Sequence, residues 1–301
     1  MISTTDSPAG SDSGVAGTWR RFWFAPADPR PLAVVRPLAA LLGLILAGSY
    51  AADLERWFGP AGMIPPRPAA AWRVPFSVSL YDGATEPSAI RGLFAATLAA
   101  FAALGVGLGT RVAAPTAAIL WASLLHRGPM LAGPADDCLA VLLWCLAVGP
   151  CGSRLSIDRW LAGRAGRRMP EASAAAAVSL GLVKLHAAAI AAAAALAQLK
   201  GAVWWDGTAA WWLAGRAGSL VDPTPLYVRS VQLMNLVSHA VVGFEILFAA
   251  GLWFSSTARD TARAGLVGWP VVGLLAGEPW WGLTLAVFCV PTACFTARNQ
   301  P

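Results

Sequence analysis

The residues of this sequence best suited to chemistry lie between Ser179 and Arg216, a stretch that carries Lys184 and Lys200. These are the two lysines of the chain, because arginine supplies the other twenty of its 22 basic residues. A lysine ammonium loses its proton readily when it is withdrawn from water, whereas an arginine guanidinium stays charged. Lys200 is therefore a candidate base. The alternative is a side chain that extends from a helix end to the lipid headgroups.

Other ionisable side chains lie within long apolar stretches, where they usually face the interior of a helix bundle. His186 follows Lys184 by two residues, and His239 and Glu245 share the stretch 229–254. Histidine can accept or pass protons near neutral pH, so both histidines are candidate relays. The simpler alternatives are interhelical hydrogen bonds from the histidines and an ion pair between Lys184 and Glu245, which lie at comparable depths in their stretches.

Two adjacent carboxylates, Asp136 and Asp137, stand at the start of an apolar run that extends to Val148. Acidic residues suit the positive end of a helix dipole, so capping explains them adequately. A role in chemistry requires Asp136 to face the same cavity as Lys200. Glu278, in a tight turn near the end of the chain, is expected to be a solvated charge.

The composition of the chain is that of a membrane protein. Of its 301 residues, 57% are hydrophobic and 13% are charged, about half the charged fraction of an ordinary soluble domain. Several apolar runs approach the roughly 20 residues that cross a bilayer, and each must be helical to satisfy its backbone. The fifteen tryptophans cluster near the ends of these runs, as interfacial anchors do.

The predicted fold is an all-α, polytopic bundle of about eight transmembrane helices. The expected crossings are residues 32–52, 90–108, 112–125, 137–148, 172–199, 229–254, 264–277 and 280–297. The domain division is a disordered tail (1–18), one membrane domain (19–297) and a short C-terminal tail (298–301).

Two long aromatic loops, residues 53–88 and 200–228, are predicted to lie on the same side and to roof an outward-facing cavity. The tryptophans expected to line its walls are Trp72, Trp204 and Trp205. The strongest arginine cluster, in residues 149–171, predicts a cytoplasmic side that also holds both termini, in a plasma (inner) membrane.

Several functions are not supported by the sequence. Basic and aromatic residues do not interleave as in a nucleic-acid groove, so no nucleic-acid partner is expected. The five cysteines lie in or beside apolar runs, contain no CxxC motif and have no metal-site spacing, so no metal is predicted.

Seven ordered segments of the chain resemble the horizontally transferred transmembrane domain (HTTM) family, which includes the membrane part of the vitamin K-dependent gamma-glutamyl carboxylase. The resemblance covers about residues 19 to 297. It is carried by FAPADPRPLAVVR, WFGPAGMIPP, LGTRVAAPTAAILW, HRGPMLAGPADDCLAVLLW, GPCGSRLSIDRWLA, LAQLKGAVWWDGTAAWW and HAVVGFEILF.

The resemblance implies roles for particular residues. Lys200 matches the proposed base that deprotonates reduced vitamin K, and Glu245 matches a buried acid of the sixth helix. Asp136 or Asp137 matches a polar group at the head of the fourth helix, where the carboxylase has a histidine. Lys184 and His186 stand where the family usually has arginine and glutamine.

The implied cofactor is reduced vitamin K or another quinol, with oxygen and carbon dioxide as small partners. Membrane lipids and an exported peptide substrate are further expected partners. Because these 301 residues hold no counterpart of the carboxylase's lumenal domain, an alternative stays open. It is a non-catalytic membrane protein that binds or escorts a lipid-like molecule or an exported polypeptide.

The base assignment makes a first prediction. Replacing Lys200→Arg keeps the charge but removes the titratable amine, so quinol-dependent turnover is expected to be abolished while membrane insertion is unchanged. Unchanged turnover in this variant contradicts the assignment of Lys200 as the base.

Overall fold

The structure, a computed structural model, describes residues 14–59, 61–73, 75, 77–168, 171–216 and 222–295. Within this part the fold is all-helical, as predicted, and extended backbone pairs at an isolated bridge between Ala27 and Ser173. Eight described helices have 15 residues or more, and each overlaps one predicted crossing. They are α2 (Arg30–Ala51), α5 (Pro87–Val106), α6 (Thr110–Arg127), α7 (Pro134–Val148), α9 (Ala174–Gln198), α13 (Val231–Gly251), α14 (Ala258–Leu275) and α15 (Pro279–Cys294).

Four of these helices, namely α2, α5, α9 and α13, are long and apolar enough to cross a membrane by length and composition. Helix α15 is apolar but has 16 residues. These helices indicate an integral membrane protein.

Shorter helices precede the long helices or lie in the connections between them. Helix α1 begins at Val15, inside the stretch expected to be a disordered tail, while residues 1–13 and the predicted C-terminal tail lie outside the described residues. The short elements are α1 (Val15–Phe24), α3 (Leu54–Phe58), α4 (Pro66–Ala71), η1 (Leu80–Gly83), α8 (Ile157–Arg164), α10 (Ala202–Trp205), α11 (Ala209–Ala214) and α12 (Thr224–Arg229).

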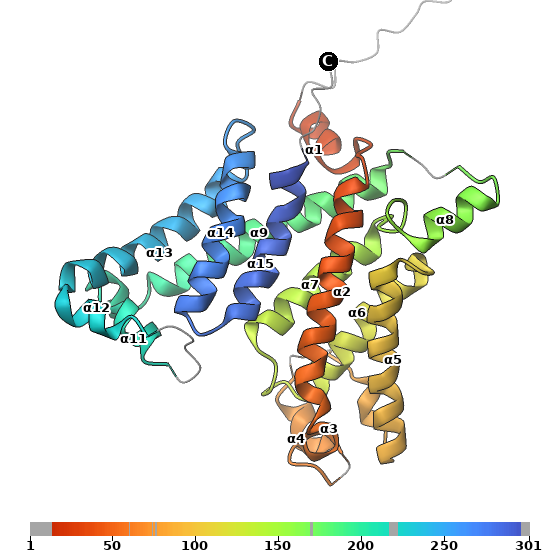
Figure 1. The fold of residues 1–301 in the computed structure, drawn as a ribbon, viewed down its shortest axis with the longest axis horizontal. Coiled ribbons are helices and arrows are strands. Elements are labelled where there is room, and N and C mark those ends of the chain that lie inside the picture. Colours follow the sequence, from red (N-terminus) through yellow and green to blue (C-terminus); the bar gives the residue numbers. More distant parts are fainter. Residues whose placement is uncertain are drawn as a thin grey trace, which may run out of the picture.

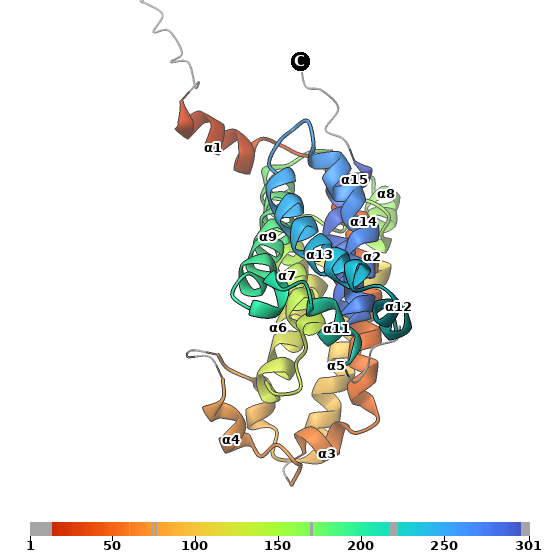
Figure 2. The same ribbon diagram turned by 90° about the vertical axis from the view of Figure 1, so that its left-hand side faces the viewer.

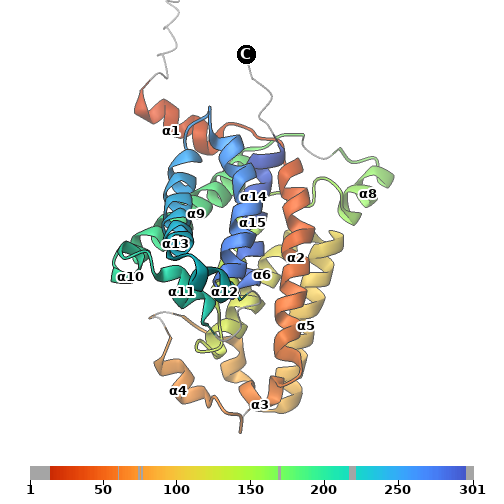
Figure 3. The ribbon, with the colours of Figure 1, turned by 60° about the vertical axis from the view of Figure 1, so that its left-hand side comes forward.

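The last helix joins the two parts of the bundle. Figures 1 and 3 show α2, α5, α6 and α7 as one group and α9, α13 and α14 as another, with α15 between them. Helix α15 contacts α2 and α7 on one side and α14 and α9 on the other. The buried aromatic side chains of the first group centre on Trp121, and those of the second on Trp269.

Glycines allow α14 and α15 to pack backbone against backbone. A Cβ atom added to Gly282 would lie 2.4 Å from the carbonyl oxygen of Trp269 and 3.1 Å from the Cα atom of Gly273. The turn between the helices contains Gly277 with φ of 73°, and the Glu278 N–H donates to the Gly273 carbonyl at 2.7 Å. Small residues permit such close approach of membrane helices.

A buried arginine fastens the loops at one end of the bundle. Arg36 of α2 is 1% exposed, and its guanidinium donates to the carbonyls of Leu104, Gly105 and Leu155. The first two belong to the last turn of α5, whose carbonyls have no partner within the helix. Beside it, Asp158 accepts the N–H groups of Gly109 and Thr110 at 2.7 Å each.

A second buried arginine fastens the other end. Arg127, the last residue of α6, is 1% exposed and donates to the carbonyls of Ile64 at 2.8 Å and Phe58 at 3.0 Å. The hydroxyl of Ser79 donates to the Ser123 carbonyl at 2.6 Å. The loop 53–88 therefore folds back on the end of α6.

The capping carboxylate of Asp158 makes a prediction about stability. Partial burial raises its pKa, but its hydrogen bonds from Thr110 and Gly109 and the charge of Arg36 outweigh this, so its pKa lies below the ordinary value. Because the folded-state pKa is lowered, the stabilisation is present above pH 4 and is lost as the pH falls through the ordinary value near 3.9 and below it.

We therefore expect Asp158→Ala to lower the free energy of unfolding by about 1 to 2 kcal/mol at pH 7. The difference from the parent protein should shrink below pH 4, which thermal or denaturant unfolding in detergent at several pH values can follow. Asp260→Ala, which removes an exposed carboxylate in the first turn of α14, should change the free energy by less than about 0.5 kcal/mol. Equal effects of the two substitutions would contradict the capping role.

Candidate functional site

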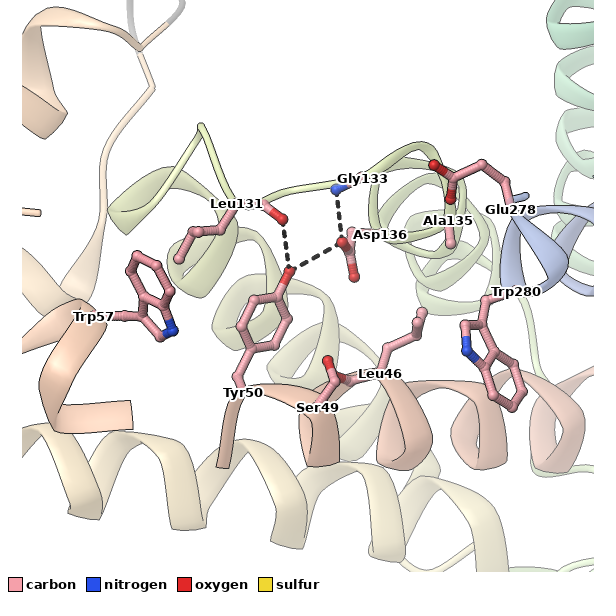
Figure 4. A pocket seen from close by; sticks show the side chains of 10 residues that line it. All are labelled: Leu46, Ser49, Tyr50, Trp57, Leu131, Gly133, Ala135, Asp136, Glu278 and Trp280. Atoms are coloured by element: carbon pink, nitrogen blue, oxygen red, sulfur yellow. Dashed lines mark hydrogen bonds between the residues drawn. The ribbon is translucent and has the colours of Figure 1, made fainter. Parts of the chain in front are cut away.

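A cavity of about 310 Å³ lies at the N-terminal end, or head, of α7, at the end of the bundle that carries α3. It is formed by α2, the start of α7, Trp57 of α3 and the turn between α14 and α15. The lining residues are Leu46, Ser49, Tyr50, Trp57, Leu131, Gly133, Ala135, Asp136, Glu278 and Trp280. Figure 4 shows Trp57 and Trp280 on opposite sides of the central pair, Tyr50 and Asp136.

The Asp136 carboxylate is only half satisfied. Its side chain is 6% exposed, and Oδ2 accepts the Gly133 N–H at 2.8 Å and the Tyr50 hydroxyl at 3.0 Å. The Tyr50 oxygen also lies 3.3 Å from the Leu131 carbonyl (Figure 4). Oδ1 is buried and has no hydrogen-bond partner among the described residues. A buried acceptor without a donor costs about 1 to 3 kcal/mol, so this atom marks a place where an external donor would be stabilised.

Helix α7 positions this carboxylate. Pro134 begins the helix after Gly133, and Asp136 reaches back to the Gly133 N–H from the first turn, so the predicted capping is confirmed for one oxygen. The Trp121 indole N–H donates to the Asp136 backbone carbonyl at 3.1 Å and fixes the main chain. The neighbouring Asp137 is exposed and does not line the cavity.

The cavity is acidic and aromatic. Two carboxylates, Asp136 and Glu278, line it together with three aromatic side chains, and the lining set contains no lysine, arginine or histidine. Glu278, expected to be a solvated charge, is half-buried and forms part of the wall. Such walls suit a ring that carries a hydrogen-bond donor.

Lys200 lies elsewhere. It follows α9 in a turn, its side chain is exposed, and it is not among the residues that line the cavity. The predicted binding tryptophans do not line it either: Trp72 is 56% exposed and Trp205 is 66% exposed, with the Trp205 indole N–H donating to the Leu199 carbonyl. Trp204 is half-buried in α10. The packing of the described residues therefore leaves Lys200 exposed, whereas the base hypothesis requires a lysine that is withdrawn from water.

Glu245 and Lys184 are not paired. Glu245 is fully buried and accepts a hydrogen bond from the Gln198 side-chain amide at 3.0 Å, whereas Lys184 Nζ lies 5.5 Å from the ring centroid of Trp253. The expected ion pair is therefore wrong. Gln198 lies 14 residues after Lys184 on α9, and Trp253 lies eight residues after Glu245 at the end of α13. The two helices therefore run antiparallel in a register that places Lys184 and Glu245 at different heights.

Both histidines bond within their own helices. The Nδ1 atom of His186 lies 2.8 Å from the Leu182 carbonyl, and that of His239 lies 2.7 Å from the Asn235 carbonyl, one turn back in each case. His186 Nδ1 is also 3.9 Å from Cys145 Sγ. This contact with α7 is an interhelical hydrogen bond of the kind expected for His186, whereas His239 makes none with the described residues of other helices.

Of the predicted site residues, only Asp136 lines the cavity. Sequence reasoning missed Tyr50, Trp57 and Trp280. A usable signal existed for Tyr50, because it is one of three tyrosines in the chain and stands at the end of an apolar run, where a buried hydroxyl needs a partner. Among the described residues, no group of three or more metal-ligating side chains is placed to hold a metal ion.

The Tyr50 hydroxyl makes a prediction of its own. Tyr50→Phe removes a donor to a buried carboxylate, so we expect the free energy of unfolding to fall by about 1 to 3 kcal/mol. Tyr227→Phe is the matched control, because the Tyr227 hydroxyl makes no hydrogen bond with any residue that the structure describes. Denaturant unfolding in detergent measures both, and equal stabilities of the two variants contradict the contribution of the Tyr50–Asp136 bond.

Comparison with known proteins does not identify the chain's relatives. No protein-family model matches it, and no curated protein or solved structure matches it either. Its function is therefore inferred from its own residues and their arrangement.

Proposed function

We propose that this chain is a multi-pass membrane protein that binds a small, lipid-soluble aromatic molecule through a hydroxyl group, in the cavity at the head of α7. The observation that carries the proposal is the unpartnered, buried Oδ1 of Asp136 in an aromatic wall. A quinol is the member of this class that the resemblance to the HTTM family implies. Its hydroxyl would donate to Oδ1, and its ring would lie among Tyr50, Trp57 and Trp280.

The size and chemistry of the cavity support a ring rather than a whole lipid. Its volume of about 310 Å³ is at the lower end of the range of small-molecule sites. The free carboxyl oxygen of Asp136 can accept a hydroxyl donor, and the wall offers no competing cation. A long isoprenoid tail would have to extend out of the cavity between the helices.

The position of Lys200 favours binding without catalysis over base catalysis. A general base must lie within hydrogen-bond distance of the proton that it removes, and Lys200 is exposed and outside the lining. A quinol-dependent carboxylase-like reaction would require the segment after α9 to move toward α7. The geometry thus supports the alternative of a membrane protein that carries or escorts a lipid-like molecule.

We further propose eight crossings with both termini in the cytoplasm. An even number of crossings is supported by α1 and the end of α15, which lie at the same end of the bundle in Figures 1 and 2. The arginines of residues 149–171 lie in the connection at that end. The cavity at the head of α7 then faces outward from a plasma membrane.

The test is the affinity for a quinol with a shortened tail, measured by calorimetry under anaerobic conditions in lipid nanodiscs. Loss of a hydrogen bond at a buried polar group costs about 1 to 3 kcal/mol, so Asp136→Asn should weaken binding roughly 5- to 100-fold. Asp137→Asn, which removes the exposed neighbouring charge, is the control and should leave the affinity unchanged.

Two results contradict the proposal. One is the absence of binding by the parent protein together with no quinone or related aromatic lipid in native mass spectra of the purified chain. The other is equal affinity of the parent protein and the Asp136→Asn variant.

A further inference from the structure

Among the described residues, the hydrogen bonds that attach α8 to the bundle come from its first turn. Ser156 caps the helix by accepting the Arg159 N–H at 3.0 Å, and Asp158 holds the start of α6. None of the eight residues of α8 is buried. Figures 1 and 3 show the helix projecting sideways from the end of the bundle where α1 and the end of α15 lie.

The apolar side of α8 lacks a protein partner in the described structure. Ile157, Trp160, Leu161 and Arg164 share one face of the helix, because they are spaced by three, four and seven residues. Trp160 is 54% exposed and Leu161 is 45% exposed. An isolated helix of this length is not stable in water, so a surrounding that accepts these side chains must contribute to its stability.

Three exposed arginines lie at the end of α8 and directly after it. The exposed arginines Arg164, Arg167 and Arg168 form no ion pair with any described residue. The guanidinium carbon of Arg164 lies 3.9 Å from the ring centroid of Trp160, so its stem follows the aromatic surface. The nearby carboxylate of Asp158 is already used by the N–H groups of α6.

We propose that α8 lies in the plane of the membrane–water interface and binds anionic phospholipid headgroups through Arg164, Arg167 and Arg168. Trp160 and Leu161 enter the boundary of the acyl chains, and the arginines extend to the phosphates. Helix α1 lies at the same end and also exposes aromatic side chains, with Trp19 62% exposed. The inference is independent of the cavity at α7, which lies at the other end of the bundle.

The first test compares two variants that each remove three positive charges. Nanodiscs are assembled from phosphatidylcholine and phosphatidylglycerol, and the lipids retained by the protein on mild delipidation are counted by native mass spectrometry. The variant Arg164→Gln, Arg167→Gln, Arg168→Gln should lose the enrichment of phosphatidylglycerol by at least tenfold, since each arginine near an anionic surface contributes about fivefold.

The charge-matched control is Arg56→Gln, Arg91→Gln, Arg216→Gln, which changes exposed arginines outside α8 and its flanking residues. It should retain the enrichment of the parent protein. Gel filtration and thermal unfolding establish that both triple variants are folded. Equal enrichment in the two variants overturns the proposal.

The second test locates the apolar face of α8 directly. Leu161→Cys is made together with Cys294→Ser, because Cys294 is the exposed one among the five cysteines, all of which are described. A polarity-sensitive dye on residue 161 should be quenched by phospholipids brominated near the headgroup end of the acyl chains. Quenching no stronger than that by a water-soluble quencher shows that α8 lies in water and overturns the proposal.

Discussion

Two buried guanidinium groups that donate to backbone carbonyls shape this molecule at its opposite ends. Arg36 and Arg127 are each 1% exposed, and the terminal nitrogens of each donate to backbone carbonyls of connecting segments. A buried charge left unpaired is costly, so each arginine fixes the path of the chain that supplies its acceptors. At the Arg127 end, the carbonyl of Phe58 is held next to Trp57, which is how a long loop comes to form part of the cavity wall at α7.

The positions of the long helices in the sequence were predictable, but which helices pack against one another was not. Apolar length alone located all eight long helices, because a bilayer leaves the backbone few other ways to satisfy its polar groups. Nothing in that pattern indicates that α15 lies between the two groups, or that Gln198 of α9 bonds to Glu245 of α13. These arrangements depend on the fit of side chains between helices that are distant in the sequence.

Of the two central residues of the candidate site, Asp136 and Tyr50, the sequence predicts only Asp136. The resemblance to the HTTM family implies a site role for Asp136 or Asp137, whereas Tyr50 lies 86 residues from Asp136 and contacts it through a hydrogen bond between α2 and α7. Lys200 was chosen for its rarity and its possible desolvation, but burial is set by tertiary packing, and the packing leaves it exposed. Residue type indicated which groups could react, and only the fold determined which of them share a cavity.

The glycine contact between α14 and α15 has a mechanical consequence for the cavity. Because main chain touches main chain there, no side chain can repack to let one helix slide along the other. Glu278 and Trp280 lie at the connection between these two helices, so their positions are fixed by a rigid helical hairpin rather than by a flexible loop. A ligand that widens the cavity would have to tilt the whole hairpin. The same tilt would displace the opposite end of the hairpin, where α14 begins and α15 ends.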